Sequence, residues 1–302
     1  MKVSKVFACA LLTTASFLAA CGGGGTDVVS APPAPFVPEA RYGAAPLQDV
    51  TLFEPTSPAK GLVVWVHGGG WVGGDKAEDL PYFEGLTAKG IAVLNVNYRL
   101  GPDGAFPKSV EDIKTVLAAL DGLPCPGCTN AELWDRARSY SAQGGTMVAG
   151  ASAGGHLALY ASAEALRLNP SSRLKCIVGQ VPLVDFRELS AYPPEFVKGY
   201  IAVFAGGDLS REHLERISPA VQVEQGAWQA ALSRKWFLFY SSEDVFVPSS
   251  TTKALTASLR AQGTALDQVD HVSTDMVGGH NVTIPTLNKH LKDSAASCFG
   301  NL

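Results

Sequence analysis

The residues best suited to chemistry are Gly150-Ala151-Ser152-Ala153-Gly154, which fit the pattern G-x-S-x-G. This pattern holds a serine on a strained turn between a strand and a helix. Small residues flank the serine because the backbone doubles back there. The apolar residues 146–149 before the motif are typical of a buried strand, and residues 155–161 after it are typical of a helix start. We therefore predict that Ser152 is a nucleophile on a strand–turn–helix elbow.

A second motif, His67-Gly68-Gly69-Gly70-Trp71, follows a strand-like apolar run. Glycines allow backbone N–H groups to converge on one point because no Cβ blocks them. Such donors can stabilise the oxyanion of a tetrahedral intermediate. A phosphate-binding loop would need Lys-Ser or Lys-Thr after the glycines, and bulky residues interrupt the spacing of a dinucleotide fingerprint. We expect the N–H groups of Gly69, Gly70 and Ala153 to form an oxyanion hole.

A carboxylate could orient a histidine beside this serine. Asp244 directly follows the strand-like residues 236–240, and a side chain at that end of a parallel strand can reach across the sheet edge. Glu243 is adjacent and could serve instead, and there are three lesser competitors, Asp267, Asp270 and Asp275. The residues alone leave this choice open.

The histidine that would act as the base is expected to be His280. It follows an alternating, strand-like stretch over 266–277 and lies next to glycines, as expected of a functional loop. His271, within that stretch, is its competitor. The remaining histidines are expected elsewhere: His67 in the glycine loop, His156 on the elbow helix, and His213 and His290 on solvated helices.

In combination these motifs resemble the hormone-sensitive-lipase-like and BD-FAE-like branch of the α/β-hydrolases, a group of carboxylesterases and feruloyl or acetyl esterases. The resemblance covers about residues 45–295. It is carried by the glycine loop, the elbow and several shorter matches, namely Gly74-Asp75-Lys76, Asn97-Tyr98-Arg99-Leu100, Phe106-Pro107, Val110-Glu111-Asp112, Ser218-Pro219, Asp244 with Val247-Pro248, and Gly279-His280.

The resemblance implies a catalytic triad in the chain order Ser152, Asp244, His280, and it favours Asp244 over Glu243. It implies hydrolysis of carboxylic esters, either small acyl or aryl esters or ester decorations of polysaccharide, without metal or cofactor. Two alternatives remain open: an amidase of kynurenine-formamidase type, and a non-catalytic surface-binding protein on the same scaffold.

The resemblance has two departures that could reshape the substrate pocket. Gly101-Pro102-Asp103-Gly104 stands where the family often has Ala or Ser followed by Pro-Glu, and an apparent insertion surrounds Cys125-Pro126-Gly127-Cys128. Residues 187–216 are expected to form a cap. Five aromatic residues are candidate pocket liners: Trp71, Phe196, Tyr200, Phe204 and Phe246.

The N-terminus indicates export. Lys2 and Lys5 precede an apolar segment that is too short to span a membrane, as in a signal peptide over residues 1–20. Leu18-Ala19-Ala20-Cys21 resembles a bacterial lipobox in which Cys21 is lipidated, and two or more acyl chains would anchor the protein to a membrane. We expect a lipoprotein at the outer membrane or facing the periplasm, with a secreted protein as the alternative. Residues 21–42 are expected to be a flexible, proline-rich linker.

Residues 43–302 are expected to form one α/β domain. Strands are predicted over 62–66, 92–97, 146–150, 176–182, 235–240 and 268–276, and helices over 109–120, 154–167 and 249–262, the last capped by Ser249. Their alternation predicts an α/β-hydrolase fold with a mostly parallel sheet of about eight strands, helices on both faces and a small cap. The net charge of −4 and the lack of a basic run give no support to nucleic-acid binding.

The cysteines suit an exported chain. Cys9 belongs to the signal peptide and Cys21 to the lipobox, which leaves four. Cys125 and Cys128 lie in a turn-rich loop, so a local disulfide is expected rather than a redox-active pair. Cys176 and Cys298 remain and could form a second bridge. A zinc site would need closer clustering of His and Cys residues.

Overall fold

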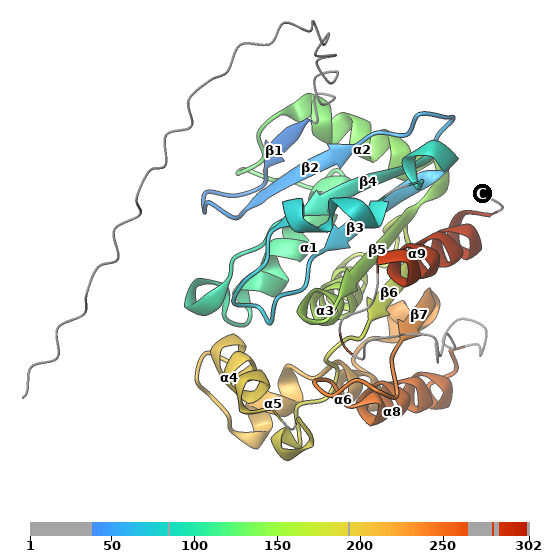
Figure 1. The fold of residues 1–302 in the computed structure, drawn as a ribbon. Helices are drawn as coiled ribbons and strands as arrows, with labels where there is room; N and C mark the ends of the chain where they lie inside the picture. Colours follow the sequence, from blue (N-terminus) through green and yellow to red (C-terminus); the bar gives the residue numbers. More distant parts are fainter. Residues whose placement is uncertain (1–37, 84, 193, 265–279, 281–283, 301–302) are drawn as a thin grey trace, which may run out of the picture. The chain divides into compact units, whose positions relative to one another are not determined.

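A twisted, mostly parallel sheet organises the protein (Figure 1). The computed structural model describes residues 38–83, 85–192, 194–264, 280 and 284–300. Within these residues the strand order is β1-β2-β4-β3-β5-β6-β7. The pairs β1–β2 and β2–β4 are antiparallel, and the other four pairs are parallel. The strands are β1 (Glu39–Arg41), β2 (Asp49–Phe53), β3 (Gly61–Val66), β4 (Ile91–Val96), β5 (Thr146–Ala151), β6 (Leu174–Gln180) and β7 (Lys235–Phe239).

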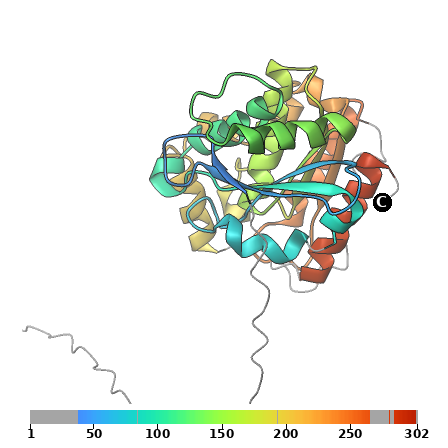
Figure 2. The same cartoon turned by 90° about the horizontal axis from the view of Figure 1, so that it is seen from above.

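Helices cover both faces of this sheet (Figure 2). One face packs against α1 (Lys108–Leu120), α2 (Ala131–Gly144), α3 (Ala153–Leu168) and α8 (Ser249–Ala261), and the other against η1 (Lys76–Phe83) and α9 (Ile284–Phe299). The shorter elements are η2 (Thr87–Lys89), η3 (Gly101–Gly104), η4 (Leu189–Ala191), α4 (Glu195–Phe204), α5 (Arg211–Arg216), α6 (Pro219–Glu224) and α7 (Gln229–Leu232).

The two layers of core follow from the alternation of side chains along each strand. In β3, Leu62, Val64 and Val66 join the core under α1–α3, whereas Val63 and Trp65 join the core under α9. Every residue of β3 is buried, as expected for a central parallel strand with helices on both sides. The glycine loop and the elbow therefore leave the sheet from buried, tightly held strands.

The predicted elements are largely confirmed. Five predicted strands correspond to β3–β7 and three predicted helices to α1, α3 and α8, whereas the sixth predicted strand, 268–276, lies outside the described residues. The Ser249 cap is wrong, because Pro248 occupies the N-cap position and no side chain caps α8. The solvated surroundings expected for His213 and His290 are also wrong, since both side chains are buried.

The folded unit begins before the expected residue 43. Strand β1 falls within the segment assigned to a linker, and it pairs in register with β2 through Glu39–Thr51 and Arg41–Asp49. Residues 1–37, which carry the predicted signal peptide and Cys21, lie outside the described residues. None of the helices that the structure describes is long and apolar enough to cross a membrane.

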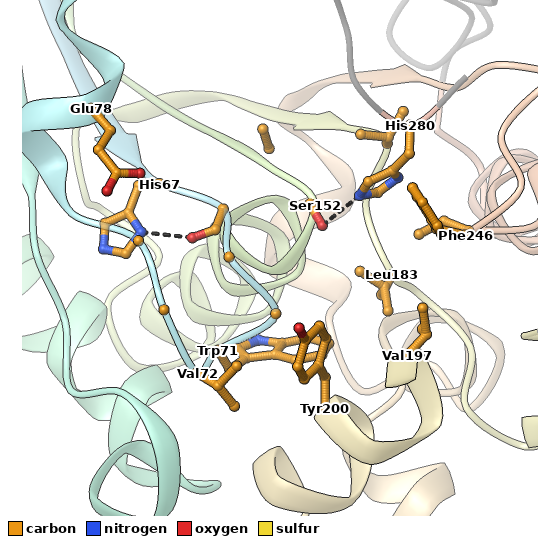
Figure 3. Close-up of a pocket in the computed structure, with 18 of the residues that line it drawn as sticks. His67, Trp71, Val72, Glu78, Ser152, Leu183, Val197, Tyr200, Phe246 and His280 are labelled. Atoms are coloured by element: carbon orange, nitrogen blue, oxygen red, sulfur yellow. Dashed lines mark hydrogen bonds between the residues drawn. The ribbon is translucent and has the colours of Figure 1, made fainter. Parts of the chain in front are cut away.

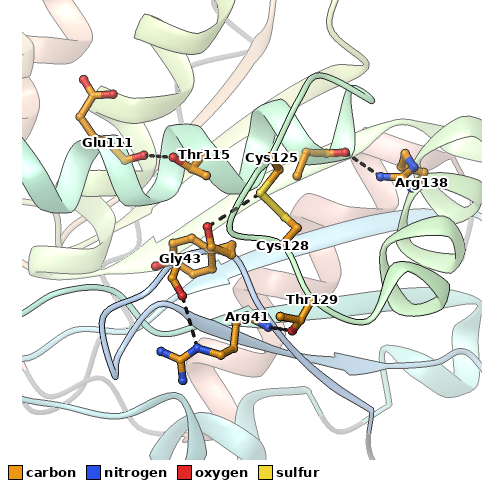
Figure 4. The surroundings of a disulfide bond; sticks show 10 residues. Arg41, Gly43, Glu111, Thr115, Cys125, Cys128, Thr129 and Arg138 are labelled. Atoms are coloured by element: carbon orange, nitrogen blue, oxygen red, sulfur yellow. Dashed lines mark hydrogen bonds between the residues drawn. A yellow bond between two sulfur atoms is a disulfide. The ribbon is translucent and has the colours of Figure 1, made fainter.

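Both predicted disulfides are confirmed. Cys125–Cys128 closes a short loop against the N-terminal edge of the sheet, where the Cys125 sulfur lies 3.8 Å from the Tyr42 carbonyl (Figure 4). Cys176–Cys298 joins β6 to α9 across 122 residues of chain. The second bridge fastens the helix that follows His280 to the centre of the fold.

Candidate active site

Ser152 occupies the predicted elbow between β5 and α3. Its backbone has φ 54° and ψ −121°, a conformation that is costly for a residue with a side chain. The turn is held by two backbone hydrogen bonds, from Ser152 N–H to the Gln180 carbonyl (2.8 Å) and from His156 N–H to the Ser152 carbonyl (3.0 Å). The strained elbow expected from the motif is therefore confirmed.

The small residues of the motif are required by close backbone contacts. A Cβ at Gly154 would lie 2.2 Å from the carbonyl oxygens of both Val66 and His67, and a Cβ at Gly150 would lie 2.4 Å from the Gly154 carbonyl oxygen. These distances are far below van der Waals contact, and their partners are backbone atoms that cannot rotate away. Only glycine fits at both positions.

The structure brings Ser152, His280 and Asp244 together, and Figure 3 shows the first two. Ser152 Oγ lies 2.9 Å from His280 Nε2, and His280 Nδ1 lies 2.8 Å from Asp244 Oδ2. The carboxylate favours the tautomer with a proton on Nδ1, so Nε2 is left to accept from the serine hydroxyl. This arrangement can move a proton from the serine onto the imidazole.

Asp244, and not Glu243, is the acid that reaches the imidazole. The Asp244 side chain is only 1% exposed, and its Oδ1 accepts hydrogen bonds from the backbone N–H groups of Phe246 (2.8 Å) and Val247 (2.9 Å). Glu243 is exposed to solvent. The other competitors, Asp267, Asp270, Asp275 and His271, lie outside the described residues.

The glycine loop lies beside the nucleophile. Gly69 (φ 112°) and Gly70 (φ 61°) adopt conformations that favour glycine, and the Gly69 carbonyl accepts from the N–H groups of Val72 and Gly73. Both glycines line the same cavity as Ser152. Ala153 is the first residue of α3, where helix geometry leaves N–H groups without an intrahelical acceptor. Of the three residues expected at an oxyanion hole, Gly69 and Gly70 thus share a cavity with Ser152, and Ala153 follows it in the chain.

His67 supports this loop from behind. Its ring stacks on Tyr98 with centroids 4.4 Å apart, and the Tyr98 hydroxyl donates to the His67 carbonyl (3.0 Å). His67 Nδ1 lies 2.7 Å from the Gly68 carbonyl (Figure 3). Burial lowers the pKa of His67, so the ring is neutral and donates to that carbonyl. This histidine is thus part of the scaffold of the loop.

A polar network fixes the chain after the glycines. Asn97, at the end of β4, accepts from the Lys76 N–H (2.7 Å) and donates to Asp75 (3.0 Å). Lys76 in turn pairs with Asp49 (2.5 Å) and Glu39 (2.9 Å) on the antiparallel strands. The Gly-Asp-Lys and Asn-Tyr-Arg-Leu matches of the sequence are therefore joined to each other by these hydrogen bonds.

A cavity of about 590 Å3 contains Ser152, His280 and the glycine loop. One part of its wall is apolar and includes Leu183, Val197 and three aromatic residues, Phe196, Tyr200 and Phe246. The other end carries three acidic residues, Asp75, Glu78 and Asp79. The aromatic residues were predicted from the sequence, whereas Leu183, Val197, Glu78 and Asp79 were not, because they belong to no motif; Asp75 belongs to a family match but was not predicted to line the cavity.

Asp79 is the most perturbed of the acidic residues. Burial raises its pKa to about 6, partly offset by a hydrogen bond from Trp65 Nε1 (2.5 Å). The charges of Glu78 and Asp75 raise it further. A carboxyl with this pKa is mainly neutral below about pH 6 and mainly charged above it.

Four of the five aromatic residues predicted to line the cavity are confirmed: Trp71, Phe196, Tyr200 and Phe246. The prediction for Phe204 is wrong. Phe204 is fully buried, stacks on Trp71 with centroids 4.6 Å apart, and is absent from the described lining of the cavity. His156 packs edge-on to both rings, and burial lowers its pKa to about 4. These side chains form an aromatic floor under the glycine loop.

Neither departure from the family pattern supplies a residue to the described lining of the cavity. Gly101–Gly104 forms η3 and donates to the Trp71 carbonyl through the Gly101 N–H (2.7 Å). Neither this segment nor the loop around Cys125 is among the described residues that line the cavity. The described residues also contain no group of three His, Cys, Asp or Glu side chains suited to a metal ion.

Comparison with known proteins assigns the family. The BD-FAE family model matches residues 49–259. A probable isoprenylcysteine alpha-carbonyl methylesterase of Oryza sativa subsp. japonica is 27% identical over 246 residues, which cover 75% of this chain and 53% of that protein. Esterase LipC of Mycobacterium tuberculosis is 26% identical over 238 residues, covering 73% and 54%. The chain thus spans about half the length of these curated relatives.

Solved structures support the same fold. A bifunctional GH43-CE protein of Bacteroides eggerthii superposes with a TM-score of 0.64 at 20% identity, covering 85% of this chain and 34% of that one. The family match extends over more than half of the chain and includes the glycine loop, the elbow and Asp244. This protein belongs to the BD-FAE family and has the α/β-hydrolase fold.

Proposed function

We propose that the protein is a serine esterase that hydrolyses carboxylic esters through an acyl-enzyme. The observation that carries this proposal is the imidazole of His280, hydrogen-bonded to Ser152 Oγ on one side and to the buried Asp244 on the other. The glycine loop and the start of α3 supply N–H groups beside the serine. Relatives named as esterases add support.

In the proposed reaction, Ser152 Oγ attacks the ester carbonyl while His280 Nε2 takes the hydroxyl proton. Asp244 keeps the Nδ1 proton in place and stabilises the imidazolium. The carbonyl oxygen becomes an oxyanion held by the N–H groups of Gly69, Gly70 and Ala153. His280 returns its proton to the departing alcohol, and a water molecule then releases the acid by the same steps in reverse order.

The substrate is proposed to be a neutral ester with a small acyl or aryl group. Apolar side chains line the wall next to His280, and the acidic residues at the other end disfavour anionic substrates. The likeness to a GH43-CE protein makes esters carried on polysaccharide a second source of the same chemistry.

The assignment of the serine is tested by Ser152→Ala. This variant is expected to fold normally and to lose hydrolysis of p-nitrophenyl acetate, since no hydroxyl remains to form the acyl-enzyme. His280→Ala is expected to be inactive, whereas His271→Ala serves as the matched control and is expected to keep its activity. Hydrolysis by Ser152→Ala at the rate of the unaltered protein would refute the proposal.

The substrate class requires a panel of esters on the purified protein. A series of p-nitrophenyl esters of increasing acyl length, with methyl ferulate and acetylated xylan, would measure the depth and breadth of the cavity. N-formylkynurenine tests the amidase alternative. Turnover of that amide, with no ester hydrolysed, would replace the esterase proposal.

We also propose that the protein is a bacterial lipoprotein anchored through Cys21. The support is the Leu-Ala-Ala-Cys sequence after an apolar segment, followed by a glycine run suited to a tether. Expression in a bacterial host with labelled palmitate should label the full chain but not Cys21→Ser. Equal labelling of both proteins would refute the anchor.

A further inference from the structure

Phe246 contacts both residues that act together with the nucleophile. Its backbone N–H donates to Asp244 Oδ1 (2.8 Å), and its ring packs against the His280 imidazole with centroids 5.4 Å apart and planes at 87° (Figure 3). One residue therefore fixes the carboxylate through its backbone and restricts the imidazole through its side chain.

The cap helix α4 supports this ring from the other side. Phe196 of α4 lies with its ring centroid 5.3 Å from that of Phe246, at an angle of 65°. Phe196 also contacts Tyr200, one turn further along α4, at 5.7 Å. These three rings and the imidazole form a continuous row of aromatic contacts, which we call the aromatic row: Tyr200, Phe196, Phe246 and His280.

The same row ends against the glycine loop. A Cβ placed on Gly70 would lie 2.5 Å from the Tyr200 ring, so this ring packs directly on the Gly70 backbone. Tyr200 of α4 thus contacts the glycine loop. Phe196, on the same helix, contacts Phe246, which in turn contacts His280. Aromatic pairs prefer such tilted and edge-to-face geometries, which restrict how the rings can shift.

We propose that Phe246 is a positioning residue that holds His280 in line between Ser152 and Asp244, and that Phe196 of the cap braces it. The inference rests on the proposed function and adds to it: the cap holds the catalytic base in place as well as forming a wall for the substrate. Because the His280 side chain is 16% exposed at the cavity, packing by Phe246 restrains it on its open side.

Steady-state kinetics test this role. A misplacement of about 1 Å can cost about a hundredfold in rate, so Phe246→Leu should lower kcat for p-nitrophenyl acetate about ten- to a hundredfold, with KM changed less than about threefold. Phe246→Tyr keeps the ring and should recover most of kcat. Phe196→Leu should lower kcat in the same direction by a smaller factor. Val245→Ala, an exposed neighbour, is the matched control and should keep the kcat of the unaltered protein.

A spectroscopic measurement separates this inference from the proposed function. The Nδ1 proton of His280, shared with Asp244, should give a low-field proton resonance in the unaltered protein and in Phe246→Tyr, and a weakened or exchange-broadened one in Phe246→Leu. An unchanged resonance and kcat in Phe246→Leu, or a change confined to KM, would overturn the positioning role. A protein that shows these resonance changes but hydrolyses no ester would refute the esterase proposal and leave the positioning role intact.

Discussion

The two sides of the cavity are built in different ways. On one side, the glycine loop and the Ser152 elbow pack backbone against backbone, with contacts at Gly150 and Gly154 that admit no side chain. On the other side, His280 is contacted by the side chains of Asp244 and Phe246, and Phe246 in turn packs against Phe196 of α4. Ser152 is therefore placed by backbone geometry, whereas His280 is held through side-chain contacts.

The largest effect is expected on the backbone side, at Gly154. Gly154→Ala forces a Cβ to 2.2 Å from two carbonyl oxygens, and relief requires the elbow and the glycine loop to separate. We expect about 5 kcal/mol or more of destabilisation and complete loss of esterase activity. Denaturant unfolding and ester hydrolysis measure both. A folded, active Gly154→Ala protein would show that the backbone side is not as constrained as described.

The next largest loss of stability is expected on removal of the Cys176–Cys298 disulfide, which fastens the helix that follows His280. Cys176–Cys298 spans 122 residues and fastens α9, so Cys176→Ala with Cys298→Ala should lower the free energy of unfolding by about 4 kcal/mol. Cys125→Ala with Cys128→Ala, which opens a loop of only three residues, should cost about 1.5 kcal/mol. Equal losses in the two double variants, measured by urea unfolding, would contradict this difference.

Substitution of Asp79 is expected to change the free energy of unfolding by a smaller amount, and to raise it. Its pKa is raised from 3.8 to about 6, so its contribution to stability is complete below pH 4 and is lost as the pH rises through 6. Asp79→Asn keeps an acceptor for Trp65 and should stabilise the protein by about 3 kcal/mol at pH 8 but not at pH 4. Glu212→Gln, at an exposed position on α5, is the control. A gain in stability that is the same at both pH values would contradict the buried charge.

The smallest effect is expected in the cap. A Cβ at Gly199, in the middle of α4, would meet nothing within 4 Å. Gly199→Ala should therefore stabilise the protein by about 0.5–1 kcal/mol through helix propensity alone. Thermal unfolding measures this change. Destabilisation by Gly199→Ala would mean that the cap is as tightly packed as the elbow, and the comparison would fail.

This contrast explains what the sequence could predict. Positions that admit only glycine produce a recognisable sequence motif. The residues of the elbow and of the glycine loop could therefore be predicted individually. Buried strands β3–β7 were predicted because their apolar runs are short and bounded by turns. Asp244 and His280 were predicted from their place after strands together with the family resemblance.

The cap could not be predicted in the same detail. Helix α4 contains Gly199 and several aromatic and β-branched residues, which have weak helix propensity, so only a cap of unspecified structure was expected. Phe204 lies eight residues after Phe196, which places it about 12 Å further along the helix, and there it meets Trp71 and not the cavity. Composition does not distinguish these two phenylalanines, because only the packed structure decides which ring faces the cavity.

The central claim is that Ser152 is an activated nucleophile, and covalent labelling tests it most directly. The purified protein is treated with a fluorophosphonate, and the adduct is located by mass spectrometry of peptides. We expect one phosphonyl group on Ser152, formed rapidly in the unaltered protein, much more slowly in His280→Ala, and not at all in Ser152→Ala. An unlabelled protein, or a label on another residue at the same rate in all three proteins, would contradict it.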